Sequence, residues 1–374
     1  MKIALVHDFL NKPGGAEKVL LALAKMYPEA PIYTLVYDPA YTSKDFPHRK
    51  IIASSLQNYP EFIRKRLKFL LPKMSSAIEE FDFTAYDAVI SSSNSFAHGI
   101  ITTPKTFHLC YCHSPMRYAW DWSNEYLAEN NVNYGLIGFV VRSMIAKIRQ
   151  WDRIVADRVD AYVANSINVA GRIKKYYRLD STVVYPPVET EQIAPQKKNL
   201  GYYMISSRLE PYKKVDLAVK VFNKNGLPLW IVGDGSQLEF LRSVAKDNIK
   251  FLGWQKPSSV FGYLSTAKAF VFPGEDDFGI APVEALAAGL PVIAHNKGGV
   301  RETVKEGKTG FFFDEQTVES MSEAVDKLEA NYTKIDKNLC RESANQFSTE
   351  NFEINFKRIF DQKYQEFRRK YDVK

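Results

Sequence analysis

The chain has 374 residues, of which 45% are hydrophobic and 25% are charged, a composition typical of a folded globular protein. A chain of this length is too long to fold around one ordinary hydrophobic core, and so two domains of moderate size are favoured. Lysine and arginine outnumber aspartate and glutamate by 50 to 43, and the resulting charge of +7 favours anionic ligands or membrane surfaces over a dedicated nucleic-acid binder.

The cysteines and the first residues of the chain indicate in which cellular compartment the protein is found. Cys110, Cys112 and Cys340 are too few for a disulfide framework, and the C-x-C spacing is poor for zinc, so we expect a reducing intracellular compartment. The opening MKIALVHDF enters a strand-like run directly, without a signal-peptide pattern. The longest apolar stretch, GLIGFVV at 135–141, is far below the ~20 residues of a membrane-spanning helix. If the protein meets a membrane, we expect it to lie on the surface.

Short apolar runs alternate with helical periodicity in the first half. Residues 2–9 predict a strand, a glycine-containing loop follows, and residues 16–27 predict a helix with apolar positions at Val19, Leu20, Leu23 and Tyr27. Further strand-like runs with polar ends are found at 86–93, 106–114 and 159–166.

The pattern stops at 183–199, where three prolines and many polar residues predict an interdomain linker. It restarts with strand-like runs at 200–209, 228–235, 249–254, 267–274, 290–296 and 309–314. We therefore predict an N-terminal domain at 1–182, the linker at 183–199, a C-terminal domain at 200–348 and a C-terminal helix at 349–374.

Apolar runs without strict alternation, separated by helices, are typical of parallel sheets covered on both faces. The predicted fold class is α/β, with two Rossmann-like doubly wound domains. Ligands of such sheets bind beyond the carboxyl ends of the strands, so the loops at those ends are the candidate sites.

One such loop, EDDFG at 275–279, leads into a predicted helix with Pro282 near its start and Gly289 past its end. The amides of Phe278, Gly279 and Ile280 are then at a helix N-terminus, where the helix dipole favours a phosphate. Glu284 falls in the predicted first turn. The alternative is that Glu284 only complements the dipole and that the acids form a solvated loop.

A second loop, ISSRLEPYKK, places Arg208 and Lys213 at a strand end, and two cations there suit a diphosphate. The alternative is a solvated basic turn. Gly233, in VGDG, only partly matches a dinucleotide loop, because Leu238 stands where a third glycine is required. Such a sequence is more often an ordinary turn.

Two loops of the first half complete the candidates. His113 ends a strand-like run, and Arg117, Tyr118 and Trp120 follow it in a setting that suits sugar contact, although a lone histidine is more often structural. Gly15 belongs to GGAE, which offers a permissive backbone at another helix N-terminus.

Together these segments resemble glycosyltransferase family 4, the retaining GT-B enzymes that use nucleotide-sugar donors, over essentially the whole chain. The resemblance rests on GGAEKVL, YCHSPMRYAWD, SRLEPYKKVDLAV, VGDG, PGEDDFGIAPVEALAAGLPVIA and GGVRETVKEGKTG. Within this family, the chain most resembles the bacterial mannosyltransferase-like members that build O-antigen and exopolysaccharide. It implies two domains facing across a cleft, with the C-terminal helix returning to the first.

The resemblance implies roles for the donor-side residues. Arg208 and Lys213 would hold the donor diphosphate, and Glu284 would accept hydrogen bonds from the ribose. The family's acidic sugar-binding residue, usually glutamate, falls on Asp276, whose side chain is one methylene shorter, so Glu275 is the alternative sugar contact.

Other roles follow from the same resemblance. The backbone of Phe278, Gly279 and Ile280 would meet the sugar and diphosphate, and His113 would contact the sugar near the reacting carbon. Gly15 would lie near the phosphates, and Gly233 and Trp254 near the base. Arg117, Tyr118 and Trp120 are the candidate acceptor contacts.

The implied reaction moves a hexose, with mannose from GDP-mannose favoured over UDP-sugars, to a hydroxyl of a glycan or polyprenyl-diphosphate-linked acceptor. No protein nucleophile is assigned, and no nucleic-acid partner is expected. We expect no cofactor and no metal, since the chain contains no D-x-D pair and Arg208 and Lys213 would replace a divalent ion.

Four other functions were weighed. A glycoside hydrolase could use Asp276 and Glu284 as its carboxylate pair, but it would not need Arg208 and Lys213. A P-loop is excluded, because Glu302 occupies the position of the first glycine before EGKTG. A GT-B sugar-nucleotide epimerase and a catalytically weak nucleotide-sugar-binding subunit remain open, the second because of the aspartate at 276.

Two segments of the first half mix cations with apolar residues, at 59–74 and 141–158. Amphipathic basic helices of this kind can lie in an anionic membrane interface, although a core-facing helix with a solvated basic face is an equal alternative. We therefore predict a cytoplasmic protein with peripheral attachment to the inner face of the cytoplasmic membrane through its first domain.

Overall fold

The computed structural model describes residues 1–64, 66–129, 132 and 134–371. The chain forms two compact units, the first Met1–Pro187 with Phe352–Lys374, and the second Val188–Asn351. The last three residues of the predicted C-terminal helix, 372–374, lie outside the described residues.

The first unit contains a seven-stranded sheet in the order β3-β2-β1-β4-β5-β6-β7, in which every pairing is parallel. The carboxyl ends of β1, β4 and β5 are therefore neighbours at one edge. The strands are β1 (Ile3–Leu10), β2 (Ile32–Tyr37), β3 (Ile51–Ala53), β4 (Ala88–Ser93), β5 (Phe107–Cys112), β6 (Ala161–Ala164) and β7 (Ser181–Val183).

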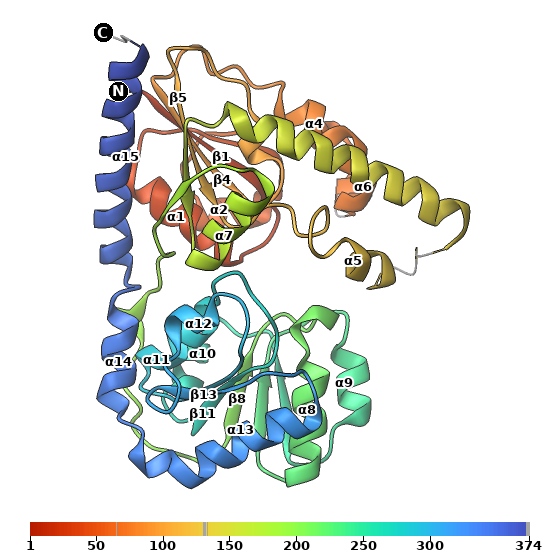
Figure 1. Cartoon of the computed structure of the whole chain (residues 1–374), viewed down its shortest axis with the longest axis vertical. Helices are drawn as coiled ribbons and strands as arrows, with labels where there is room; N and C mark the ends of the chain where they lie inside the picture. The colour runs from red at the N-terminus through yellow and green to blue at the C-terminus, as the bar shows by residue number, and fades with distance from the viewer. Residues whose placement is uncertain (65, 130–131, 133, 372–374) are drawn as a thin grey trace. The chain divides into compact units, whose positions relative to one another are not determined.

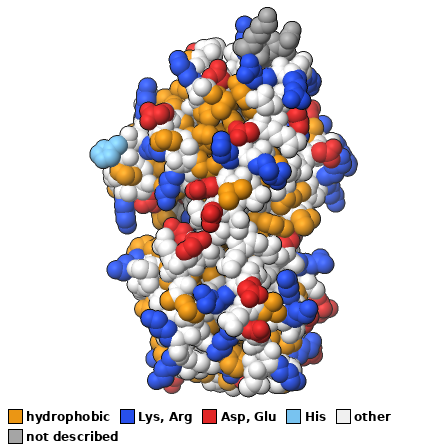
Figure 2. All heavy atoms as spheres, turned by 90° about the vertical axis from the view of Figure 1, so that its left-hand side faces the viewer, with side chains coloured by type: hydrophobic (Ala, Val, Ile, Leu, Met, Phe, Trp, Pro, Cys, Tyr) orange, Lys and Arg blue, Asp and Glu red, His pale blue; other side chains and the backbone are white. Residues whose placement is uncertain are grey.

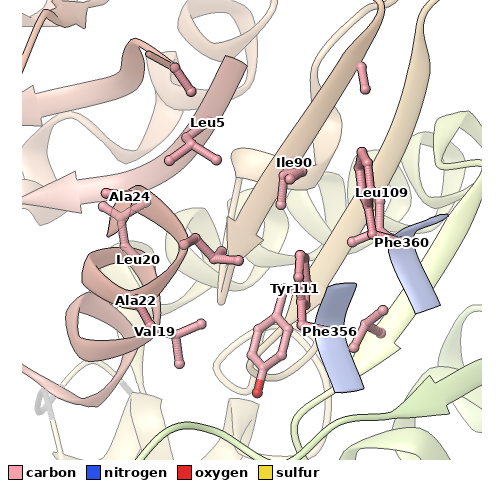
Figure 3. Close-up of a cluster of buried hydrophobic side chains, with 14 of the residues drawn as sticks. Leu5, Val19, Leu20, Ala22, Ala24, Ile90, Leu109, Tyr111, Phe356 and Phe360 are labelled. Atoms are coloured by element: carbon pink, nitrogen blue, oxygen red, sulfur yellow. The ribbon is translucent and has the colours of Figure 1, made fainter. Parts of the chain in front are cut away.

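Helices cover both faces of this sheet, because successive residues of its strands are apolar on both sides. Leu5 of β1 belongs to a buried cluster that also contains residues of α1 (Gly15–Met26) and of α15 (Thr349–Tyr371). Figure 3 shows Phe356 and Phe360 of α15 on the side of Tyr111 and Leu109. The neighbouring Val6 packs on the other face with α4 (Leu71–Ile78) and α6 (Gly135–Val155). The remaining α-helices of the described part are α2 (Pro39–Asp45), α3 (Glu61–Arg64), α5 (Ser123–Glu129) and α7 (Ile167–Tyr176).

The second unit contains a six-stranded parallel sheet in the order β10-β9-β8-β11-β12-β13. Its strands are β8 (Tyr203–Ser206), β9 (Leu229–Val232), β10 (Ile249–Gly253), β11 (Ala269–Phe272), β12 (Val292–His295) and β13 (Gly310–Phe313). Its helices are α8 (Val215–Asn225), α9 (Leu238–Val244), α10 (Pro257–Leu264), α11 (Ile280–Ala287), α12 (Val300–Thr303), α13 (Val318–Asn331) and α14 (Lys337–Asn345), labelled in part in Figure 1.

The prediction of two parallel doubly wound sheets is confirmed, and each of the ten predicted strand-like runs contains a strand. Three strands, β2, β3 and β7, were missed. β3 and β7 have three residues each, too few for a periodic signal, and both are at edges of the sheet. The predicted linker 183–199 begins at the last residue of β7, and Val188 within it pairs with Ser348 as a β-bridge.

The basic segment 59–74 does not form one amphipathic helix. It is divided among α3, a 3₁₀ turn (Leu67–Phe69) and the first turn of α4, and Lys65 within it lies outside the described residues. Pro72 explains part of the break, because a proline is accommodated in the first turn of a helix but not in its interior.

The segment 141–158 belongs mainly to α6, and its apolar residues Ile145, Ile148 and Val155 are buried. One side of this part of the helix therefore faces the core. Among the described residues, no helix is both long enough and apolar enough to cross a membrane. Figure 2 shows charges of both signs interspersed on one face of the molecule.

Candidate active site

Lys213 and Asp276 form an ion pair in the second unit. Strands β8 and β11 are neighbours in the sheet, so the loops at their carboxyl ends meet. Lys213 ends a 3₁₀ turn (Pro211–Lys213), and its Nζ donates to both carboxylate oxygens of Asp276 at 2.6 Å. The side chains are 14% and 25% exposed, so the pair is partly shielded from water yet open to a ligand. An anion that binds Lys213 must compete with Asp276.

Gly274 allows the two loops to approach this closely. A Cβ atom at this position would lie 3.0 Å from both the Cα and the carbonyl oxygen of Lys213. Contacts at that distance with a backbone cannot be relieved by rotating a side chain. The glycine therefore holds the loop of Asp276 against the loop of Lys213.

Two further glycines, Gly298 and Gly299, follow β12 and contact the backbone of the acidic loop. The Gly299 amide donates to the carbonyl oxygen of Asp276 at 3.0 Å. A Cβ on Gly298 would lie 2.3 Å from that oxygen, and one on Gly299 would lie 2.4 Å from the oxygen of Asp277. In the sequence these glycines belong to the segment GGVRETVKEGKTG, and no role was predicted for them.

The two adjacent acids are used differently. A Cβ on Gly298 would lie 3.1 Å from Cγ of Glu275, so this side chain packs toward the end of β12. Burial lowers the pKa of His295, at the end of the same strand, and the charge of Glu275 opposes that shift. Asp276 is thus the acid that contacts Lys213, and Glu275 lies near His295.

Helix α11 begins at Ile280, with Gly279 as its N-cap in the left-handed region at φ 89°. The amides of Phe278, Gly279 and Ile280 are therefore at its N-terminus. The Phe278 ring is buried and contacts Phe347 edge to face at 5.3 Å between centroids, which anchors the loop.

Glu284 is the fifth residue of α11, and so the placement in its first turn was wrong. The helix begins at Ile280, because the left-handed Gly279 ends the preceding loop. Glu284 is 8% exposed, in keeping with a specific role more than with a solvated charge.

The turn VGDG has a structural explanation. A Cβ on Gly233 would lie 1.8 Å from the carbonyl oxygen of Ser207, and one on Gly235 would lie 2.5 Å from that of Leu209. These glycines therefore let the turn pack directly against the loop that carries Arg208. Arg208 is exposed at the end of β8, and Trp254, directly after β10, is 63% exposed.

In the first unit, His113 follows β5 and belongs to a chain of buried polar groups. Its Nε2 lies 2.8 Å from the Ser92 hydroxyl oxygen, which also lies 3.1 Å from Nδ1 of His7. Nε2 of His7 lies 3.9 Å from the Glu17 carboxylate, in the first turn of α1, whose first residue is Gly15. His7, Ser92 and Glu17 were not identified from the sequence, although VHDF, SSS and GGAE each occur at a predicted strand end or helix start.

Burial, followed by the neighbouring His7, lowers the pKa of His113 to about 3, so the ring is neutral near pH 7. A neutral imidazole has one donor and one acceptor nitrogen. Since Ser92 occupies Nε2, Nδ1 is the ring nitrogen that has no hydrogen bond to any residue of the described structure. His113 is therefore equipped for one directed hydrogen bond to a ligand.

The candidate acceptor residues make contacts within their own unit. The indole Nε1 of Trp120 donates to buried Asp152 at 2.7 Å, and its ring stacks on Tyr176 at 4.7 Å. The Tyr118 hydroxyl lies 3.1 Å from that of Ser95, and the Arg117 guanidinium lies over the Trp122 ring. These contacts fix the shape of the loop after His113.

The described residues contain no group of three or more His, Cys, Asp or Glu side chains placed to hold a metal ion. Cys110, Cys112 and Cys340 are free thiols, and all three are buried.

Two family models match the chain. Glycosyltransferase Family 4 matches residues 13–192, and Glycosyl transferases group 1 matches residues 189–348. A Mycobacterium tuberculosis protein named GDP-mannose-dependent alpha-(1-6)-phosphatidylinositol monomannoside mannosyltransferase is 30% identical over 218 residues, which cover 50% of this chain and 57% of that protein. A Corynebacterium glutamicum mannosyltransferase with a related name is 29% identical, with the same coverage. The chain thus spans little more than half the length of these relatives.

Solved structures share the fold. An Anabaena protein crystallised with UDP gives a TM-score of 0.69 at 17% identity, covering 97% of this chain and 100% of the other. A sucrose-phosphate synthase from Thermosynechococcus elongatus gives 0.73 at 16% identity, with coverage of 96% and 98%. These similarities confirm the GT-B fold. The sheets, the two matched models and these neighbours establish that the chain belongs to the GT-B glycosyltransferases that join a Glycosyltransferase Family 4 domain to a Glycosyl transferases group 1 domain.

Proposed function

We propose that this protein is a retaining glycosyltransferase. It moves a hexose from a nucleoside-diphosphate sugar to a sugar hydroxyl of a glycan or lipid-linked glycan. The observation that carries the proposal is the arrangement at the ends of β8 and β11, where partly shielded Lys213 meets Asp276 beside the N-terminus of α11. A cation and the N-terminus of a helix at one strand edge suit a diphosphate.

The chemistry assigned to these groups follows from charge. As the nucleoside diphosphate leaves, the anomeric carbon becomes positive and the diphosphate gains negative charge. Lys213 and Arg208 stabilise that negative charge, and fixed donors of this kind supply the largest share of many enzymatic rate enhancements. An oxygen of the departing diphosphate takes the proton of the acceptor hydroxyl on the same face, so no protein nucleophile is needed.

Other residues are also proposed to contact the donor. Asp276 accepts hydrogen bonds from the transferred sugar, and Glu284 accepts them from the ribose. His113 uses its remaining nitrogen toward the sugar near the reacting carbon. Backbone at Gly15 and the loops near Gly233 and Trp254 complete the donor site.

We propose GDP-mannose as the donor, in preference to UDP-sugars. The support is the names of the two relatives at 29% and 30% identity, both of which are GDP-mannose-dependent mannosyltransferases. We further propose that turnover needs no metal, because Arg208 and Lys213 replace it. Addition of EDTA is expected to leave turnover unchanged, and a rate restored only by Mg²⁺ or Mn²⁺ would contradict this part.

Thermal-shift measurements with GDP, UDP and ADP, followed by donor turnover with the matching sugars, test the proposal. GDP is expected to raise the melting temperature most, and GDP-mannose is expected to be consumed in the presence of acceptor. Binding without turnover on any acceptor would instead indicate a nucleotide-sugar-binding subunit. Conversion of the donor alone into an epimeric sugar nucleotide would indicate an epimerase.

The acceptor is proposed to be a glycan on a polyprenyl diphosphate, reached by peripheral contact with the inner face of the cytoplasmic membrane. The support for membrane contact is the charge of +7 and the cation-rich sequence of the first unit.

A further inference from the structure

Helix α6 begins with an apolar end that projects into solvent. Five large apolar side chains within seven positions are 57% to 90% exposed; these are Tyr134, Leu136, Ile137, Phe139 and Val140, called here the α6 apolar end. Further along the same helix Ile145 and Ile148 are buried in the core. Isolated exposed apolar residues are ordinary, whereas a contiguous group of this size marks an interaction surface.

The α6 apolar end continues into a groove between α4 and α6, two helices that lie side by side in Figure 1. The groove has a volume of about 650 Å³, and its apolar lining includes Leu71, Pro72, Phe139, Val140, Met144 and Trp151. Phe69, two residues before the start of α4, is a further exposed aromatic residue, at 60%. The apolar surface therefore comes from two segments that are far apart in sequence.

Cations outnumber acids around this surface, although Glu79 accepts a hydrogen bond from the groove residue Trp151 and pairs with Arg158. Residues 134–149 contain three cations and no acid, and residues 66–78 also contain three cations and no acid. Arg142, Lys147 and Lys73 among them are exposed. An occupant must therefore present apolar material beside negative charge, which is the chemistry of an anionic bilayer interface.

We propose that the α6 apolar end and the α4–α6 groove bind an anionic lipid bilayer. The apolar side chains insert at the boundary between headgroups and acyl chains, and Arg142, Lys147 and Lys73 lie against lipid phosphates. The proposal deepens the proposed function, since it rests on the lipid-linked acceptor and assigns the surface that reaches it. The surface includes parts of both segments named in the sequence prediction, 59–74 and 141–158, and adds the exposed apolar residues of 134–140.

Flotation of the full chain with vesicles tests the proposal. Wild type is expected to float at low salt with vesicles of equal parts phosphatidylglycerol and phosphatidylcholine, and weakly with phosphatidylcholine alone. The triple variant Leu136→Gln/Ile137→Gln/Phe139→Gln is expected to lower the bound-to-free ratio at least ~10-fold. Ile154→Gln is the matched control, because Ile154 is 67% exposed at the other end of the same helix. It is expected to bind as wild type does.

A charge variant gives an independent reading if the apolar variant folds poorly. Arg142→Gln/Lys147→Gln is expected to weaken binding to anionic vesicles roughly 10-fold or more and to reduce its salt dependence. The matched control Lys174→Gln/Lys357→Gln removes two exposed cations elsewhere and is expected to have little effect.

Two results would overturn the proposal: wild type that stays unbound at low salt, or apolar and charge variants that bind as wild type does. Sedimentation velocity identifies the competing occupant. If the triple variant disperses a dimer without loss of flotation, the surface would be assigned to a second copy.

The GDP thermal shift is recorded on the same samples. Lost flotation with a normal shift would refute only the membrane proposal, and flotation without any nucleotide shift would refute only the donor site.

Discussion

At the residue scale, Lys213 is the side chain on which most of the proposed chemistry depends. It lies over the rings of Tyr212 and Phe272 and is 14% exposed, so its ammonium is held in a fixed place. Fixed charges stabilise a developing anion better than mobile ones because little reorganisation is needed.

We expect Lys213→Ala to lower kcat by about 10²- to 10³-fold, the usual cost of losing one fixed donor to a transition-state anion. Glu284→Ala is expected chiefly to raise the KM for the donor, since a ribose contact is made equally in ground and transition states. Initial rates over a range of donor concentrations separate the two. The exposed neighbour gives the control Lys214→Ala, and wild-type activity in both site variants would remove the site assignment.

Asp276→Asn removes the charge that competes with an anion for Lys213. We expect pyrophosphate and GDP to bind severalfold more tightly to this variant, while kcat falls because the sugar contact is weakened. Isothermal titration and steady-state rates measure the two effects. Asp276→Glu is the conservative comparison, and weaker GDP binding by Asp276→Asn would show that the pair does not oppose the diphosphate.

Ser92→Ala tests whether the hydrogen bond with Ser92 positions the ring of His113. Without the hydroxyl, Nε2 of His113 loses its partner, so the ring is free to change tautomer or rotate. We expect kcat to fall about 10-fold or more with little change in donor KM, and ¹⁵N shifts of the labelled histidine to show a changed tautomer. Ser91→Ala, which removes the partner of His108 instead, is the matched control. An unchanged His113 spectrum in Ser92→Ala would contradict the positioning role.

Buried histidines also set a dependence of stability on pH. Burial lowers the pKa of His108, as it does that of His113, from 6.5 to about 3. Below about pH 6.5 the unfolded chain takes up a proton on each ring, and the native protein does not. The free energy of unfolding therefore falls as the pH falls from about 6.5 toward about 3. The slope is at most ~1.4 kcal/mol per pH unit for each ring. Urea unfolding is measured at about pH 7 and about pH 5. Between these two values the free energy of unfolding is expected to fall less in His108→Gln than in wild type, and an equal fall in both proteins would contradict the prediction.

At the element scale, glycines decide how the loops at the strand ends stack. The loop after β11 contacts the loop after β8 through Gly274 and the end of β12 through Gly298 and Gly299, and each contact brings backbone against backbone. The site is therefore built from loops of three strands that are held at distances no side chain would permit.

Gly298→Ala is expected to cost about 1–3 kcal/mol of unfolding free energy, because its Cβ would meet the Asp276 oxygen at 2.3 Å and its φ of 73° is unfavourable for alanine. The displaced acidic loop should also weaken GDP binding. Gly262→Ala, in α10 with open space around it, is the control and is expected to be neutral or slightly stabilising. Urea denaturation and GDP titration measure both effects, and a neutral Gly298→Ala would contradict the stacking.

At the scale of the whole molecule, helix α15 completes the core of the first unit from the far end of the sequence. Phe352, Phe356 and Phe360 are buried among residues of β1, β4, β5 and α1. The first unit therefore needs the last residues of the chain to cover one face of its sheet.

Phe356→Ala is expected to destabilise the protein by about 3–5 kcal/mol, the usual cost of removing a buried aromatic side chain. Ile354→Ala, at 57% exposure on the same helix, is the control and should cost under about 0.5 kcal/mol. Thermal or urea unfolding measures both, and equal small effects would show that α15 does not complete the core.

The sequence by itself determined the α/β class, ten of the thirteen strands and the loops that carry the candidate residues. This was possible because apolar runs, glycines and helix starts are local signals, and because carboxyl ends of parallel strands share an edge. The prediction missed β2, β3 and β7; of these, β3 and β7 have three residues each, too few to carry a periodic pattern.

Only the tertiary structure decided which groups meet. That Asp276, and not Glu275, pairs with Lys213 depends on where Gly274, Gly298 and Gly299 place the loop backbone. That Ser92 joins His7 to His113 depends on the order of three strands in the sheet. The apolar start of α6 is likewise exposed only because no other described part of its unit covers it. Contacts between distant segments and exposure to solvent are properties of packing, and a local pattern of residues does not contain them.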